Sequence, residues 1–369
     1  MSEWRDTTLG EVLNFQRGFD ITRKTQASGG VPVVSSGGIA SFHDTAAAAG
    51  PGVVIGRKGT LGKVFYLPGH YWPHDTTLWV QDFKSNLPRF VYYFMKQFDT
   101  SWLDAGSANP TLNRNHLHPL RVSWPAIHVQ QAVAEVLGAL DDKIAANTKL
   151  AAAADELLAT RLSAFIQHDT KQVPLGEIAQ VNASKVKPIP GTGLRYIDIA
   201  AVGVGSFDFP DITLWDDAPS RARRGVQRGD TLWSTVRPNR RSHALNLSED
   251  PLLVASTGFA VLSPRTVGWA YLYELTRRPE FTAYLETVAE GSAYPAVRAE
   301  RFGEALVPLI SGPSRNLFES IAEPLRETAH MLITENRTLA ATRDALLPQL
   351  MSGKLRVKDA EKALEDAGV

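Results

Sequence analysis

Residues 221–241 concentrate arginine in a way that suits contact with phosphate groups or base edges. The segment holds seven arginines against one acid, Asp230, and the chain has no lysine between Lys187 and Lys354. A planar guanidinium forks onto a phosphate or a guanine edge, and a solvated surface would mix arginines with acids, so the segment favours nucleic-acid contact. Asn239 could read adenine, although an asparagine beside a proline is more often a turn residue. The candidates are Arg221, Arg223, Arg224, Arg237, Asn239, Arg240 and Arg241.

A second basic stretch, GRKGTLGK at residues 56–63, invites comparison with a phosphate-binding loop. That loop requires G-x-x-x-x-G-K followed by Ser or Thr, but Arg57 replaces the first glycine and Val64 follows the lysine. We therefore predict a glycine-rich turn between two strands. The turn is either a solvated basic hairpin or a loop that approaches a phosphate backbone, since glycine allows close approach. Its candidate contacts are Arg57, Lys58, Thr60 and Lys63.

The residue types that carry catalysis do not occur at catalytic spacing. The chain has no cysteine, which excludes disulfides, thiolate zinc sites and a cysteine nucleophile. The histidines of HLH at 116–118, taken with His128, lack a fitting carboxylate cluster. The stretch ANPT at 108–111 lacks the second proline and the aromatic residue of an adenine methyltransferase loop. We expect no catalysis, no metal site and no cofactor bound by this chain.

The composition is that of an ordinary globular chain of two or three domains. Hydrophobic residues make up 44% and charged residues 21% of the 369 residues, and the formal net charge is zero. Zero net charge argues mildly against nucleic-acid binding, but the arginines are segregated from the acids. The polar start, MSEWRDTTLGEV, does not resemble a signal peptide, and no apolar run reaches membrane-spanning length. We expect a cytoplasmic protein without membrane contact.

Three pairs of similar segments occur in the same order in the two halves of the chain. They are TLGEV (8–12) with PLGEI (174–178), GSANP (106–110) with GSAYP (291–295), and NTKLAAAADELL (147–158) with NRTLAATRDALL (336–347). The last pair agrees at seven of twelve positions. The offsets are 166, 185 and 189, so the second copy is longer in its middle. Each half therefore consists of a variable region followed by a more constrained one.

The constrained regions are predicted to be long helices. Residues 127–165 contain no proline, and a stripe with 4–3 spacing runs from Val133 to Phe165. A matching segment runs from about residue 314 to 351. A 40-residue helix would be ~60 Å long and needs a partner along its length, for which the other copy is the natural choice. The predicted spacer contacts are Leu140, Ile144, Asn147, Leu158, Ile333, Asn336 and Leu347.

Two asparagines occupy the same heptad-like position in the two predicted helices, Asn147 in the first and Asn336 in the second. An asparagine between paired helices costs stability but fixes the register and the choice of partner. The alternative, to which we give equal weight, is that both side chains face solvent.

The variable regions carry short apolar runs broken by Gly, Pro and Asn, such as VPVVSSGG and LRYIDIAAV. Such runs favour strands joined by glycine-rich turns, with short helices at 89–98 and 269–286. The predicted fold class is α+β, with two mixed domains that are each followed by a long helix. The predicted boundaries are 1–125 and 171–310 for the mixed domains, 126–170 and 311–353 for the helical regions, and 354–369 for a tail.

In the order and doubling of these segments the chain resembles the DNA specificity subunits of type I restriction-modification systems. The matching features are the two openings, the closing segments GSANPTLNRNHLHPLRVSWP and GSAYPAVRAERFGEALVPLI, and the ending LLPQLMSGKLRV. The resemblance covers nearly the whole chain. It implies two target-recognition domains, at 1–125 and 171–310, and two helices that pair as an antiparallel coiled coil with pseudo-twofold symmetry.

The resemblance also implies a function and a set of partners. Each recognition domain would read one half of a split target in double-stranded DNA, without cutting or methylating it, and the helix pair would set the gap. Two methyltransferase subunits would dock on the helices, and restriction subunits would join them. Those partners would use S-adenosylmethionine, and ATP with Mg2+, whereas this chain would bind no cofactor. The alternative is a duplicated protein-binding scaffold with an incidental arginine patch.

Overall fold

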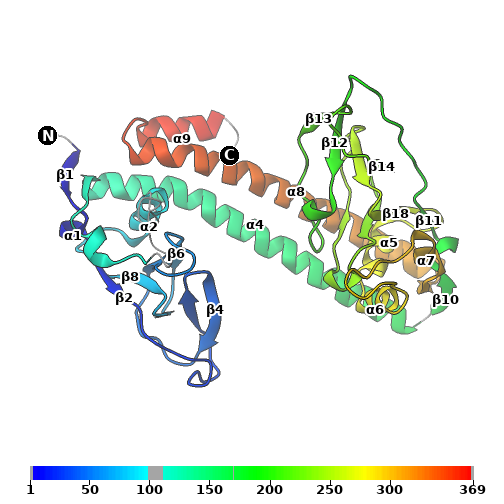
Figure 1. Ribbon diagram of the computed structural model, residues 1–369, viewed down its shortest axis with the longest axis horizontal. Helices are drawn as coiled ribbons and strands as arrows, with labels where there is room; N and C mark the ends of the chain where they lie inside the picture. The colour runs from blue at the N-terminus through cyan, green and yellow to red at the C-terminus, as the bar shows by residue number, and fades with distance from the viewer. Residues whose placement is uncertain (1–2, 99–110, 169, 367–369) are drawn as a thin grey trace. The chain divides into compact units, whose positions relative to one another are not determined.

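The computed structural model describes residues 3–98, 111–168 and 170–366, so the GSANP segment lies outside the described residues. Contacts divide the chain into two compact units. Unit 1 consists of residues 1–146 and 336–369, and unit 2 consists of residues 147–335. Both boundaries fall inside the long helices α4 (Ile127–His168) and α8 (Gly312–Met351). Each long helix therefore contributes one half to each unit (Figure 1).

Helix α4 buries the stripe of residues that its 4–3 spacing predicts. Leu140 and Leu158 are 4% and 0% exposed, Asn147 is 4% exposed, and Ile144 is half-buried. The residues between them are mainly alanines and charged residues, which suit the exposed faces of a helix. The stripe therefore marks the face of α4 that packs against the rest of each unit.

In helix α8 the buried stripe differs from the prediction at one position. Leu347 is buried and Asn336 is half-buried, but Ile333 is 38% exposed. Leu332 is half-buried in its place, because the stripe passes from Ala329 through Leu332 to Asn336 in steps of three and four. The repeat aligns Ile333 with Ile144 of α4, which is half-buried, and this alignment places Ile333 on the predicted buried face.

In unit 1 the first half of α4 packs antiparallel against the second half of α8. Asp141 and Arg343 form an ion pair at 2.6 Å, and Asn336 Nδ2 donates a hydrogen bond to Ile144 O at 3.4 Å. Residue numbers therefore rise along α4 as they fall along α8. Apolar side chains of both halves belong to one hydrophobic core that also includes the strands of unit 1.

In unit 2 the second half of α4 and the first half of α8 pair in the same way. Asn147 Nδ2 donates to Glu335 Oε2 at 2.7 Å, and Arg326 Nη1 lies 2.6 Å from Asp155 Oδ1. Since Asn147 is buried and bonded to the other helix, it faces that helix and not solvent. This is the position in which an asparagine specifies the register of a helix pair.

The strands of unit 1 form three small sheets. Their bounds, with the short helices, are β1 (Trp4–Thr8), α1 (Leu9–Val12), β2 (Asn14–Arg17), β3 (Val31–Ser35), β4 (Gly38–His43), β5 (Gly52–Gly56), β6 (Val64–Leu67), β7 (Trp72–Pro73), β8 (Thr77–Asp82), α2 (Pro88–Gln97), α3 (Arg114–Leu117), β9 (Arg121–Pro125) and α9 (Val357–Asp366). The main sheet is antiparallel with order β2-β8-β5-β6. A second sheet has order β4-β3-β7, and β1 pairs with β9 just before α4 begins.

Unit 2 contains the same arrangement. Its elements are β10 (Thr170–Pro174), η2 (Leu175–Glu177), β11 (Ala179–Val181), β12 (Gly193–Ile197), η3 (Ile199–Ala201), β13 (Ile212–Leu214), β14 (Ala222–Gly225), β15 (Thr231–Ser234), η4 (Pro238–Arg240), β16 (His243–Leu245), β17 (Leu253–Ser256), β18 (Phe259–Pro264), α5 (Trp269–Thr276), α6 (Pro279–Thr287), α7 (Ala299–Glu304) and β19 (Leu306–Ile310). The main sheet is antiparallel with order β11-β18-β15-β16, the second has order β13-β12-β17-β14, and β10 pairs with β19.

The two units share one strand order. Counted along the chain, each main sheet runs first, fourth, second, third. In each second sheet one strand pairs antiparallel with its successor and parallel with a later strand: β3 with β4 and β7, and β12 with β13 and β17. At the place of β14, the described residues of unit 1 have a single antiparallel bridge between Ala48 and Tyr71 and no full strand. This extra strand contributes to the longer middle of the second sequence copy.

One short helix in each unit links the sheets to the long helices. In unit 1 the hydroxyl of Tyr93, in α2, donates to Asp141 of α4 at 2.6 Å. In unit 2 Arg277, directly after α5, forms an ion pair with Asp155 of α4. Each strand-rich domain is therefore held to its half of the helix pair by buried or half-buried polar groups as well as by the apolar core.

The tail contains a helix that the sequence analysis did not predict. Helix α9 follows α8 after a turn at Gly353, whose φ of 66° suits glycine. Ala360 of α9 is 0% exposed and belongs to the same core as Leu339 and Leu346 of α8. The tail therefore covers part of α8. In the described part of the chain, no helix is long and apolar enough to cross a membrane.

Candidate nucleic-acid interface

The first basic stretch and the end of the second, residues 235–241, fall on corresponding loops of the duplicated main sheet. One loop joins β5 to β6 and the other joins β15 to β16, the second and third strands of each sheet. The same backbone hydrogen bond marks the start of both loops. Leu112 N donates to Arg57 O at 3.0 Å in unit 1, and Val297 N donates to Thr235 O at 2.8 Å in unit 2. The two loops share no residue pattern, so their equivalence appears only in the fold.

The predicted glycine-rich turn between two strands is confirmed in unit 1. Strands β5 and β6 pair antiparallel, and Gly56 N donates to Lys63 O at 2.8 Å across the loop. A Cβ at Gly56 would lie 2.0 Å from Thr60 O, so this close approach requires glycine. The side chains of Lys58, Thr60 and Lys63 are exposed, whereas Arg57 is half-buried.

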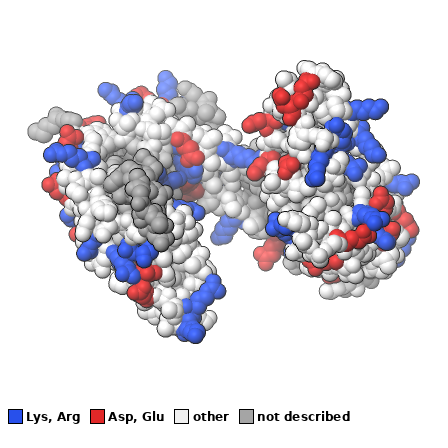
Figure 2. All heavy atoms as spheres, in the orientation of Figure 1, with Lys and Arg blue, Asp and Glu red and all other residues white. Residues whose placement is uncertain are grey.

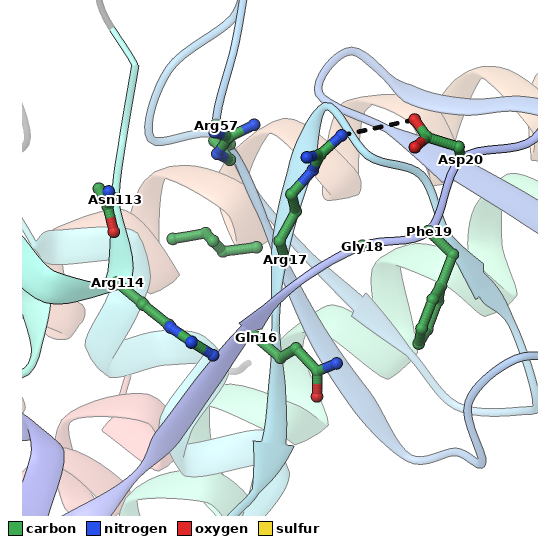
Figure 3. Close-up of a pocket in the computed structure, with 9 residues that line it drawn as sticks. Gln16, Arg17, Gly18, Phe19, Asp20, Arg57, Asn113 and Arg114 are labelled. Atoms are coloured by element: carbon green, nitrogen blue, oxygen red, sulfur yellow. Dashed lines mark hydrogen bonds and ion pairs between the residues drawn. The ribbon is translucent and has the colours of Figure 1, made fainter.

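Arg57 lines a cavity of about 480 Å³ in unit 1, which we call the arginine cavity (Figure 3). Its walls come from the end of β2 and the residues after it, from the start of the β5–β6 loop, and from the beginning of α3. The polar and charged lining residues are Gln16, Arg17, Asp20, Arg57, Asn113 and Arg114. Guanidinium and amide groups are the side chains that most often contact phosphates and base edges.

Two of the three arginines in the arginine cavity are held by neighbours. Arg17 pairs with Asp75 at 3.0 Å and with Asp20 at 3.4 Å. Arg57 Nη1 donates to Asp75 O at 3.3 Å. Arg114 is exposed and forms no ion pair with any residue in the described ranges. Arg114 is therefore the group in this cavity best placed to gain an anionic or base partner.

A histidine beside the cavity is held in its neutral form. Burial, with the charges of Arg114 and Lys84, lowers the pKa of His118. Its Nε2 accepts a hydrogen bond from Phe15 N at 3.1 Å, which a protonated ring could not do. His118 thus supports the strand that carries Gln16 and adds no positive charge near neutral pH.

The sequence analysis identified Arg57 and missed the other lining residues of the arginine cavity. Gln16 and Arg17 end the strand that follows TLGEV, and Asn113 and Arg114 follow the GSANP repeat. Polar residues next to repeated segments are the signal that would have indicated them. Their spacing along the chain gives no sign that they meet the β5–β6 loop.

The arginines at 221–224 lie on or beside β14, the strand found in unit 2 alone among the described residues. Arg221 is exposed, and Arg223 and Arg224 are half-buried. Arg223 Nη1 donates to the neighbouring Ala222 O at 2.6 Å, and Arg224 forms a backbone bridge with Lys185. These three arginines therefore lie at the edge of the second sheet. The candidates on the β15–β16 connection belong to a later segment of the chain and to the main sheet.

The connection from β15 to β16, which we call the 235–242 loop, carries the remaining candidates. Arg237 and Arg241 flank the turn η4 in the left-handed region, at φ 51° and 55°, a conformation that costs a residue other than glycine about 1–3 kcal/mol. Arg241 Nη2 donates to a backbone carbonyl oxygen just after α5 at 3.0 Å. Asn239 and Arg240 are exposed at the tip. Arg241 therefore stabilises the loop, while Asn239 and Arg240 remain accessible.

Acidic and basic side chains are interspersed over the visible face of each unit (Figure 2). Equal numbers of the two signs agree with this picture, since 39 Lys and Arg balance 39 Asp and Glu. On this face, a broad basic surface is therefore not the basis for binding a polyanion. Contacts would have to come from local groups such as the arginine cavity and the 235–242 loop.

Comparison with known proteins supports one family. Residues 1–155 match the family model described as Type I restriction modification DNA specificity domain. The chain is 22% identical over 202 residues, 54% of its length, to the Type I restriction enzyme HindI specificity subunit of Haemophilus influenzae, and the match spans 44% of that protein. The S subunit of a type I restriction-modification system from M. genitalium has a similar structure, with a TM-score of 0.67 at 15% identity over 94% of this chain and 96% of that one.

The duplicated α+β domains, each followed by a long helix, are the fold of a type I specificity subunit, and the predicted fold class is confirmed. The resemblance inferred from the sequence is confirmed as well. The match to the type I restriction-modification DNA specificity domain covers residues 1–155, which is less than half of the chain.

Proposed function

We propose that this chain is a non-catalytic subunit that binds double-stranded DNA sequence-specifically, with each recognition domain reading one half of a bipartite target. The observation that carries the proposal is the duplicated main sheet, whose corresponding loops present different polar side chains. Phosphate contacts position a protein on DNA, and base contacts specify the sequence. Two domains of one fold with different loops therefore suit two different half-sites.

Corresponding positions in the two units differ in the way that an asymmetric target requires. The loop after β5 begins with Arg57, whereas the loop after β15 begins with Thr235. Asn113 precedes α3 and caps it, whereas Arg298 precedes α7. The sheet strands, in contrast, keep the same order. The loops differ between the two units, whereas the strand order is the same. The target sequence can therefore change without a change of fold.

We also propose that the helices α4 and α8 set the spacing between half-sites and dock two methyltransferase subunits. Polar contacts such as Tyr93 with Asp141 attach each domain to its half of the helices. Leu150 and Leu157 of α4 are 55% and 43% exposed. The methyltransferase subunits would bring S-adenosylmethionine, and restriction subunits would bring ATP with Mg2+, while this chain holds neither.

The proposed function is tested with the assembly purified from its native host through a tag on this chain. We expect the assembly to enrich a two-part motif from a randomised duplex library, and its affinity to fall with added salt. Replacing Arg57 and Arg114 with alanine should alter one half of the motif and leave the other half unchanged. If both replaced arginines contact phosphates, the slope of log affinity against log salt should become shallower by about 2.

Arg121→Ala is the matched control for this test, because Arg121 is exposed in unit 1 but does not line the arginine cavity. Its motif should equal that of the wild type. A wild-type assembly that enriches no motif, or whose affinity does not respond to salt, would contradict the DNA-binding proposal and favour the protein scaffold.

A second prediction concerns the exposed leucines of α4. In the aligned repeat, Leu150 and Leu157 correspond to Leu339 and Leu346, which are 2% and 8% exposed in a core that includes part of α9. On α8 this leucine face is covered by other parts of the chain, whereas the corresponding face of α4 is exposed. Replacing Leu150 and Leu157 with serine should reduce co-purification of the methyltransferase subunits by at least about tenfold, since each buried leucine contributes roughly 1.5–3 kcal/mol.

Ile212→Ser is the control for the leucine variant, because Ile212 is 58% exposed on the edge strand β13. Both variants should keep the wild-type unfolding midpoint, since the residues are exposed. Unchanged amounts of methyltransferase in the leucine variant, measured by quantitative mass spectrometry of the tagged assembly, would exclude this face as the docking surface.

A further inference from the structure

Arg237 and Tyr294 form a stacked pair on the surface of unit 2. Arg237 Cζ lies 4.3 Å from the centroid of the Tyr294 ring, well within the ~6 Å range of a cation–π contact. Tyr294 is 69% exposed, whereas Tyr271 and Tyr273 of the same unit are at most 2% exposed. The pair therefore lies at the surface and is not part of the core.

The backbones on both sides of the pair are tied together. Arg237 N donates to Pro295 O at 2.7 Å, and Val236 forms an antiparallel bridge with Ala296. On the other side of the 235–242 loop, Arg240 N donates to Arg237 O at 2.9 Å, which closes the turn η4. Arg237 therefore projects from a backbone with several hydrogen bonds, and its guanidinium lies over the tyrosine ring.

The charge of Arg237 is not neutralised by an acid. No ion pair joins Arg237 to any residue that the structure describes, whereas nearby Arg298 pairs with Glu290 at 3.0 Å. Arg241 of the same loop bonds to a backbone carbonyl oxygen. Of the two arginines that flank η4, only Arg237 has a guanidinium that forms no hydrogen bond with any described residue.

We propose that Arg237, positioned over the ring of Tyr294, donates two hydrogen bonds to O6 and N7 of a guanine in the half-site read by unit 2. This inference rests on the proposed DNA-binding function. Guanine is the base that presents two acceptors on its major-groove edge, and a planar guanidinium matches them in a bidentate way. A phosphate contact needs only a cation within reach, which exposed Arg240 already supplies. A fixed orientation matters only where an edge with defined geometry is read.

The experiment compares motifs that variant assemblies, purified from the native host, enrich from a randomised duplex library. For Arg237→Ala and Arg237→Lys we expect the preference for guanine at one position to fall by roughly 5- to 150-fold, with the other positions unchanged. Lysine keeps the charge but lacks the fork, so it separates base reading from phosphate binding. Tyr294→Phe should keep the preference, whereas Tyr294→Ala should lose several-fold of it. Arg265→Ala is the matched control, because Arg265 is exposed in unit 2 and is not one of the candidate contacts, and it should behave as wild type.

Two outcomes overturn the inference while the proposed function stands: a wild-type motif in both Arg237 variants, or uniformly weaker binding without loss at any one position. A wild-type assembly that enriches no motif contradicts the proposed function itself. Thermal unfolding of each variant assembly shows whether the variant folds. If Arg237→Ala does not fold, the comparison of Tyr294→Phe with Tyr294→Ala still tests the inference.

Discussion

Replacing Arg326 with alanine is expected to lower the free energy of unfolding by about 3–5 kcal/mol. The Arg326 side chain, on α8, is 9% exposed and contacts two acids: Nη1 lies 2.6 Å from Asp155 of α4, and Nε lies 2.5 Å from Glu274 of α5. Glu274 is 1% exposed. Without Arg326, the Glu274 carboxylate would remain buried with only Arg277 at 3.4 Å to offset its charge. Leaving a buried charge without its partner is among the largest single-residue effects known in protein stability.

The pKa values of the two acids show how strongly this cluster depends on its arginines. Burial raises the pKa of Glu274, and the charges of Arg326 and Arg277 only partly oppose it. Burial also acts to raise the pKa of Asp155, but the hydrogen bond from Arg277 and the charges of both arginines outweigh it and lower the pKa to about 2. The stabilisation from Asp155 is therefore present above pH ~4 and is lost as the pH falls toward 2.

Chemical denaturation of the full chain, with hydrogen exchange to locate the change in unit 2, measures the effect of Arg326→Ala. Arg228→Ala is the matched control, because Arg228 pairs with Glu327 where both side chains are partly exposed, at 36% and 46%, so its loss should cost at most about 1 kcal/mol. Changing Glu274 to Gln together with Arg326 to Met should recover part of the stability. If Arg326→Ala stays within 1 kcal/mol of wild type, the cluster does not hold α5 to the long helices.

The long helices could be predicted from sequence because their burial follows a regular spacing over many turns. One stripe from Val133 to Phe165 was enough to identify the buried face of α4, including Asn147. The spacing was less informative in α8, where Leu332 and not Ile333 faces inward. Where the number of residues between successive buried positions changes from four to three, the buried position shifts by one residue. The amino-acid composition does not indicate such a change.

The arrangement of the strand-rich domains could not be predicted in the same way. Strand order depends on contacts between segments that lie far apart in sequence, such as β2 with β8 and β11 with β18. The two copies have diverged in those segments, so only the structure shows that the β5–β6 and β15–β16 loops correspond. The arginine cavity has the same origin, since Arg17, Arg57 and Arg114 meet only in the folded domain.

One physical cause explains why the long helices could be predicted from sequence and the strand-rich domains could not. A buried helix face must repeat its apolar residues every three or four positions, whereas a loop on a sheet is free to change as long as its ends stay paired. The sequence repeat is therefore strongest where a helix packs, at 147–158 and 336–347, and weakest in the candidate contacts. Under the proposed function, a change of target would alter the loops first, so the proposed contacts would leave the weakest trace in a comparison of the two halves.

The second large effect is expected at His243, which makes the stability of unit 2 depend on pH. His243 is 1% exposed and stacks on Trp233 with ring centroids 4.7 Å apart. Its Nδ1 lies 2.6 Å from Arg241 O, and since a carbonyl oxygen only accepts, Nδ1 carries the proton and Nε2 does not. Burial, opposed by this hydrogen bond and aided by the charges of Arg277 and Arg241, lowers the pKa of His243 from 6.5 to about 4.

Because the unfolded chain binds a proton at higher pH than the folded one, stability should fall as the pH drops from about 6.5 to about 4, by up to roughly 3 kcal/mol. Replacing His243 with phenylalanine should flatten this part of the profile while costing about 1 kcal/mol at pH 7 through the lost hydrogen bond. His128→Gln, at an exposed site, should leave the profile unchanged. Denaturation series from pH 4 to 8 measure the slopes, and parallel profiles for wild type and His243→Phe would show that protonation of His243 is not what weakens the fold. Protonation adds a proton at Nε2 and leaves the hydrogen bond from Nδ1 to Arg241 O in place, so the expected loss of stability comes from placing a charge at a buried site.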